Sequence, residues 1–117
     1  MSDHGDGQGD HYLWRKSFPY EVSTHVPGII TWPRGASVLM QAGAVTPLLG
    51  ELRDIFPTVL DIANVPLPPG RVLNGSSWAC LVRTDPTGKK CGPGGEAWRS
   101  TLDLEHSLIF NEVSPRS

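Results

Sequence analysis

Five side chains that could bind a metal ion fall within nine residues near the start of the chain. They are separated by glycines and comprise Asp3, His4, Asp6, Asp10 and His11. Carboxylates and neutral imidazoles are both metal ligands, and glycine lets a backbone turn tightly beside a ligand. The pattern therefore predicts a cation site with Asp3 and His4 as neighbouring ligands. A solvated acidic loop is the alternative that composition leaves open.

The composition describes a small, loop-rich chain. Its 117 residues suffice for one small domain, and its 13 Gly and 11 Pro exceed ordinary usage. A net charge of −2 without a basic run predicts no binding to nucleic acid. No apolar run of about 18 residues occurs, so no membrane span is expected. The first residues lack the basic and apolar regions of a signal peptide, which leaves the cellular location open.

The two cysteines, Cys80 and Cys91, do not form a CxxC pair. A structural zinc site is therefore not expected. A disulfide and two free thiols are both compatible with their spacing.

Apolar spacing predicts one helix among short strands. Residues 48–63 place apolar side chains at helical intervals, and the helix is expected to start with Asp54 as its N-cap and to stop before Pro66. Pro57 then falls in the first turn, where it is tolerated. Residues 26–32 (VPGIITW) predict a buried strand, and shorter strands are expected at 38–40, 98–104 and 107–110.

Four short motifs follow one another in order. They are residues 2–5 (SDHG), 23–27 (STHVP), 52–63 (LRDIFPTVLDIA) and 73–77 (LNGSS). In this order they resemble the sulfatase family of the alkaline phosphatase superfamily, and within it the iduronate-2-sulfatase-like branch. The resemblance spans roughly residues 2–112.

The resemblance implies an α/β fold, namely part of an alkaline-phosphatase-like sandwich with a central sheet flanked by helices. Residues 1–112 would form the C-terminal portion of a sulfatase catalytic domain, and residues 113–117 a frayed tail. The implied activity is hydrolysis of a sulfuric ester in a sulfated small molecule or glycan. A phosphate or phosphonate monoester hydrolase of the same superfamily and a non-catalytic metal-binding remnant are the alternatives. Members of the family are often lysosomal, secreted or periplasmic.

The resemblance also implies roles for single residues. Asp3 and His4 match the pair that holds a divalent cation, and Lys16 matches a lysine that contacts the sulfate. A cation and a fixed ammonium would both stabilise negative charge on the sulfuryl oxygens. Calcium is expected because the resembled branch uses it, whereas a histidine ligand favours manganese or zinc.

Three further residues lie where the resembled branch lines its pocket. His11 is assigned to the catalytic side, and Trp14 and His25 are assigned to substrate binding. For both histidines, a packed or solvent-facing side chain is the alternative.

The family's nucleophile, a formylglycine made from the cysteine of C-x-[PA]-x-R, has no counterpart. Cys91 is followed by Pro93, but Gly95 stands where arginine is required, and Cys80 has Val82 where proline or alanine is required. The chain is therefore expected to be an incomplete catalytic domain that is inactive alone. The missing N-terminal half of the domain is its expected partner, because it would cover a sheet edge and an apolar face.

Overall fold

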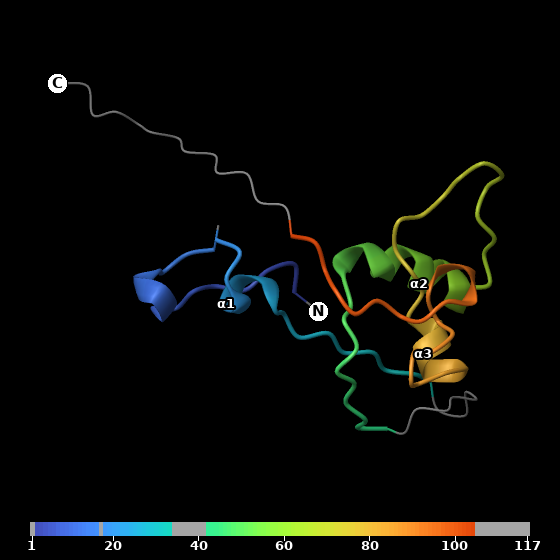
Figure 1. Cartoon of the computed structure of the whole chain (residues 1–117), viewed down its shortest axis with the longest axis horizontal. Coiled ribbons are helices and arrows are strands. Elements are labelled where there is room, and N and C mark those ends of the chain that lie inside the picture. The colour runs from blue at the N-terminus through green and yellow to red at the C-terminus, as the bar shows by residue number, and fades with distance from the viewer. Residues whose placement is uncertain (1, 17, 34–41, 105–117) are drawn as a thin grey trace. The chain divides into compact units, whose positions relative to one another are not determined.

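The structure is a computed structural model that describes residues 2–16, 18–33 and 42–104 (Figure 1). Its elements are short helices and 3-10 turns: η1 (Asp10–Tyr12), α1 (Glu21–Thr24), η2 (Leu52–Asp54), α2 (Ile55–Ile62), α3 (Ala79–Arg83) and η3 (Pro93–Gly95). No helix in these ranges is long and apolar enough to cross a membrane. The chain divides into two compact units. The first runs to Ile29 and resumes at Asp103, and the second is Ile30–Leu102.

In the first unit, the N-terminal loop packs its backbone directly against α1. The Gly5 amide donates a 2.9 Å hydrogen bond to the Ser23 carbonyl. A Cβ atom at position 5 would lie 1.8 Å from the Val22 carbonyl oxygen, so a larger residue requires the backbone to move. This contact fixes the chain immediately after Asp3 and His4.

In the second unit, α2 follows the predicted helix closely. It ends at Ile62, before Pro66, and Pro57 lies in its first turn. Asp54 directly precedes α2, as predicted, but its side chain does not cap that helix. Instead, the carboxylate accepts a 2.9 Å hydrogen bond from the Glu51 amide, which closes the turn η2.

The core of the second unit is small and surrounds a disulfide between Cys80 and Cys91. This bond settles the alternative that the spacing left open. Leu81, Cys91 and Trp98 are buried together. The Trp98 indole also donates a 2.7 Å hydrogen bond to the Leu49 carbonyl, which ties the segment before η2 to the last part of the unit.

The predicted central sheet is absent from the part of the chain that the structure describes. Residues 26–32 and 98–104 contain no strand, so both strand predictions are wrong. A strand needs a neighbouring strand to pair its amides and carbonyls, and residues 26–33 make no backbone hydrogen bond to another described segment. The strands predicted at 38–40 and 107–110, and the predicted tail 113–117, lie outside the described residues.

Candidate functional site

Three of the residues predicted to contact a metal and a sulfate lie together in the first unit. Lys16 Nζ is 2.5 Å from His4 Nε2, and Asp3 Oδ2 is 3.6 Å from the same nitrogen. His4 Nδ1 is 3.1 Å from the Gly5 carbonyl oxygen. If Nδ1 carries the proton and donates it there, the lone pair of Nε2 faces Asp3 and Lys16.

The backbone of this loop is held on both sides of His4. The Ser2 hydroxyl donates a 2.7 Å hydrogen bond to the His4 carbonyl, and Gly5 packs against α1. The side chains themselves are open to solvent, with 41% of His4 and 79% of Asp3 exposed. The loop therefore exposes the Asp3 carboxylate and the His4 imidazole at the surface of the first unit.

The donor atoms of Asp3 and His4 fit two positions of a cation site. Atoms 3.6 Å apart can both touch one ion at a ligand distance of about 2.0–2.6 Å. Within the described residues, no group of three His, Cys, Asp or Glu side chains is placed to hold an ion. Lys16 faces the same nitrogen, so its ammonium must turn away when a cation binds. Asp3 and His4 therefore fit part of a cation site, with two of its ligands.

Two of the three other predicted pocket residues have partners of their own. The ring of His11 stacks on Tyr20, with centroids 4.2 Å apart and an angle of 18° between planes. His25 Nδ1 lies 2.6 Å from Glu21 Oε1, one turn earlier along α1. Trp14 is 76% exposed. These contacts do not join the three residues to the metal pair, so their roles stay predictions.

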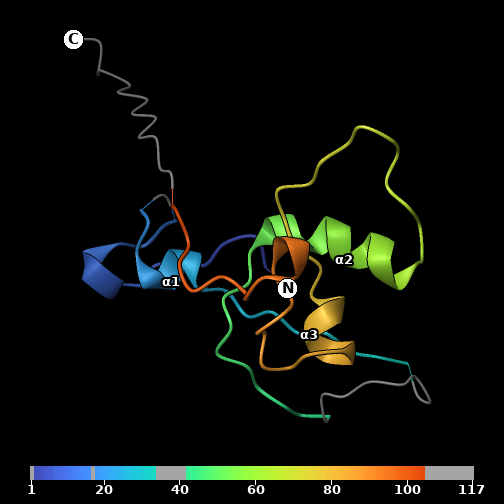
Figure 2. The ribbon, with the colours of Figure 1, turned by 45° about the vertical axis from the view of Figure 1, so that its right-hand side comes forward.

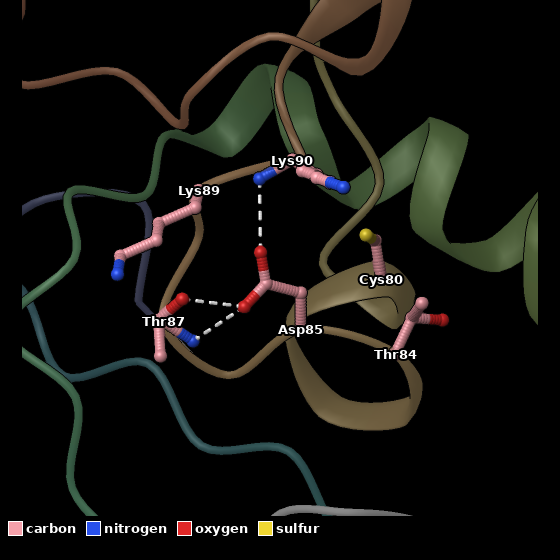
Figure 3. Close-up of a pocket in the computed structure, with 6 residues that line it drawn as sticks. All are labelled: Cys80, Thr84, Asp85, Thr87, Lys89 and Lys90. Atoms are coloured by element: carbon pink, nitrogen blue, oxygen red, sulfur yellow. Dashed lines mark hydrogen bonds between the residues drawn. The ribbon is translucent and has the colours of Figure 1, made fainter.

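A shallow cavity of about 370 Å³ lies in the second unit, beside α3 (Figure 3). It is lined by Cys80, Thr84, Asp85, Thr87, Lys89 and Lys90. Asp85 accepts hydrogen bonds from the Thr87 hydroxyl and from the amides of Thr87 and Lys90. The Thr87 hydroxyl and these amides hold the pKa of Asp85 below its usual range. This carboxylate therefore organises its own loop.

The most elaborate polar cluster is one that the sequence did not reveal. Asp54 is fully buried and accepts five hydrogen bonds. Oδ1 accepts from the Ser76 amide at 2.8 Å and Arg99 Nη2 at 2.7 Å. Oδ2 accepts from the Glu51 amide at 2.9 Å, the Trp78 indole at 3.1 Å and Arg99 Nη1. Burial raises the pKa of Asp54, but the bonds from Arg99 and the two amides outweigh it and leave the pKa below its usual value.

This cluster joins two of the motifs found in the sequence. A Cβ atom on Gly75 would lie 2.0 Å from the Arg53 carbonyl oxygen, so residues 73–77 pack directly on the start of the helix. Gly75 in the motif LNGSS is the one residue whose type could have indicated this close contact from the sequence. The pairing of Arg99 with Asp54 could not be predicted in that way, because the two residues are 45 positions apart.

Comparison with known proteins finds relatives among curated sequences, whereas no family model and no solved structure matches the chain. An arylsulfatase of Clostridium perfringens is 37% identical over 92% of this chain and 20% of its own length. Arylsulfatase K of Rattus norvegicus is 40% identical over 68% of this chain and 13% of its own length. Human steryl-sulfatase is 39% identical over 62% of this chain and 12% of its own length. The chain thus spans about a fifth, or less, of these relatives.

These similarities support the sulfatase family for this chain, and with it a family of sulfuric ester hydrolases that have an α/β fold. In the ranges that the structure describes, the chain forms short helices and 3-10 turns. The finer resemblance to the iduronate-2-sulfatase-like branch stays a prediction.

Proposed function

We propose that this chain is a portion of a sulfatase catalytic domain and that the whole domain hydrolyses sulfuric esters. The proposal rests on one observation. Asp3 and Lys16 both lie close to His4 Nε2, in a chain whose relatives are named sulfatases. The substrate is proposed to be a sulfated small molecule or glycan.

In this proposal each of the three residues has a separate task. Asp3 and His4 Nε2 would hold a divalent cation, with calcium preferred over manganese or zinc. The cation would supply positive charge that stabilises the sulfuryl oxygens as they become more negative. The Lys16 ammonium would turn from His4 to a sulfate oxygen, as a point charge on a flexible stem.

The chain does not itself supply the nucleophile of this reaction. Cys80 and Cys91 are bonded to each other, so neither is free to be converted to formylglycine. We therefore expect the purified chain to leave aryl sulfates intact, with or without added calcium. Turnover above the buffer background that disappears in Asp3→Ala would contradict this expectation.

Metal binding is tested by titrating the chain with calcium or zinc while following the His4 ring by nuclear magnetic resonance. We expect millimolar metal to shift the ring signals. Asp3→Asn should abolish the shift, whereas Asp6→Asn should not, because Asp6 Oδ1 bonds only the nearby Gln8 amide at 3.3 Å in the described structure. An equal response in the two variants would show that no specific site exists.

The role of Lys16 requires a complete sulfatase. We suggest a chimera in which this chain replaces the matching fifth of the Clostridium perfringens arylsulfatase. Lys16→Ala should lower its kcat/KM by roughly 10²–10³ and leave its thermal stability unchanged, because the ammonium acts on developing charge. The matched control is Lys89→Ala, which changes a surface lysine in the second unit. It should alter neither kcat/KM nor thermal stability. A loss of stability with intact kcat/KM would contradict the assignment.

A further inference from the structure

The loop between α2 and α3 carries a sequence that can accept an N-linked glycan. Asn74, Gly75 and Ser76 form an Asn-x-Ser triplet whose middle residue is not proline. The chain has two other asparagines, Asn64 and Asn111, and neither is followed two residues later by serine or threonine. Position 74 is therefore the only acceptor of this kind in the sequence.

The fold anchors this triplet at its second and third residues and leaves the asparagine in solvent. In Figures 1 and 2, the yellow loop that follows α2 swings away from the helix and returns past it to α3. On its return, the Gly75 backbone packs on the Arg53 carbonyl. The Ser76 amide then donates a 2.8 Å hydrogen bond to Asp54 Oδ1. Asn74 itself is exposed, so the bend holds it at the surface of the second unit.

The two side-chain groups that define an acceptor make no hydrogen bond in the folded unit. Neither the Asn74 amide group nor the Ser76 hydroxyl bonds to another of the described residues. Ser76 holds Asp54 through its main-chain amide, which a side-chain substitution leaves in place. A glycan on Asn74 therefore breaks no hydrogen bond of this unit.

The disulfide is a second observation that points to the compartment in which such glycans are added. Cys80 and Cys91 of the same unit are bonded to each other. Disulfides persist in secreted proteins and in the lumen of the secretory route, and they are rare in the cytosol. N-linked glycans occur on exposed loops of secreted proteins. The disulfide and the exposed triplet thus agree on one route for this chain.

We propose that Asn74 is the attachment site of an N-linked glycan. The donor is an oligosaccharide carried on a polyprenyl pyrophosphate. The bond between C1 of its first sugar and the phosphate oxygen breaks, a bond from C1 to Asn74 Nδ2 forms, and the proton lost by the amide leaves with the pyrophosphate. The proposal does not depend on sulfatase activity. Because a glycan is bulky and needs solvent around it, the bend at 74–75 must lie on the outside of the whole protein.

The test expresses residues 1–117 behind a secretory signal in a eukaryotic host. We expect a glycosylated form that a peptide N-glycosidase converts to a faster-migrating band. Asn74→Gln and Ser76→Ala should each abolish that glycosylated form. Ser76→Thr should retain it, because threonine also supplies the hydroxyl of the triplet. Asn64→Gln is the matched control, since it removes an exposed asparagine outside the triplet and should leave the glycosylated form unchanged.

Mass spectrometry of the tryptic peptide 72–83, which lies between Arg71 and Arg83 inclusive of the latter, locates the modification. The glycosidase should convert Asn74 to aspartate in this peptide. A sample without the glycosidase controls for spontaneous deamidation of the Asn-Gly pair, which gives the same product.

Four outcomes would overturn the proposal. The secreted chain could lack the glycosylated form altogether. That form could persist in Ser76→Ala, which would place the sugar elsewhere, or disappear in Ser76→Thr, which would show that the hydroxyl is not what is recognised. Lastly, peptide 72–83 could be unmodified in the protein purified from its own cells. Each result is read from mass and migration, and none depends on hydrolysis of an aryl sulfate.

Discussion

Asp54→Ala removes a carboxylate that accepts five hydrogen bonds, and we expect it to destabilise the second unit severely. The substitution leaves the Arg99 guanidinium without its buried partner and takes the acceptor from the Ser76 amide and the Trp78 indole. Because the Asp54 side chain is fully buried, water does not replace these bonds unless the structure opens.

The size of the effect follows from the burial of the two charges. Removing one partner of a buried ion pair costs about 3–5 kcal/mol, since the other charge stays behind unpaired. Arg99 softens this loss, because its side chain is 17% exposed and retains Glu51 at 3.3 Å. We therefore expect a loss of about 3–4 kcal/mol. A small domain has a total stability of about 5–15 kcal/mol, so much of the second unit's stability would disappear.

Urea unfolding followed by tryptophan fluorescence measures this loss, because Trp78 and Trp98 both lie in the second unit. Asp61→Ala is the matched control. It is the same change in an exposed residue of α2, the helix that Asp54 directly precedes, and the Ser77 hydroxyl that it releases can bond to water. We expect this control to cost about 1 kcal/mol or less.

Equal shifts of the urea midpoint in the two variants would refute the reasoning. A second check uses Arg99→Met. If the charges stabilise each other, Asp54→Ala and Arg99→Met together should cost clearly less than the sum of the single changes. Additive costs would mean that the two residues do not act as a pair.

Three further predictions concern pH, the disulfide and the N-terminal loop. The pKa of Asp54 is lowered on folding, so its stabilisation is complete above about pH 4 and is lost as the pH falls through the folded-state pKa. Urea midpoints measured from pH 6 to pH 2 should fall below pH 4, and less steeply in Asp54→Asn. Changing Cys80 and Cys91 to serine should cost about 2–4 kcal/mol in the same assay, and an unchanged midpoint would contradict a structural disulfide. Gly5→Ala should disturb the amide spectrum of the first unit, because its Cβ would meet a backbone carbonyl at 1.8 Å, whereas Gly28→Ala, with open space around it, should not.

The helix was predictable from sequence because its signals are local. The intervals between apolar residues set its period, and the prolines at 57 and 66 set its limits. Strands depend on a partner elsewhere in the chain, which an apolar run such as residues 26–32 does not reveal. The same apolar pattern did not reveal that Phe56, Val59 and Ile62 of α2 are each about half exposed.

The candidate site was predictable only in part, for a related reason. The adjacency of Asp3 and His4 is visible in the sequence, whereas the family resemblance assigned Lys16 to the sulfate and did not predict its contact with His4. The ion pair of Asp54 with Arg99 and the pairing of the cysteines are contacts between distant residues. Neither residue spacing nor composition specifies such contacts.

The second unit depends on a disulfide and an ion pair as well as on its apolar core. Among the described residues, its buried apolar side chains are Ala79, Leu81, Cys91 and Trp98, a core too small to hold a domain by apolar burial alone. A disulfide and the Asp54–Arg99 pair supply what the core lacks, as they do in other small scaffolds. Asp54→Ala should therefore destabilise the isolated chain and the chimera alike.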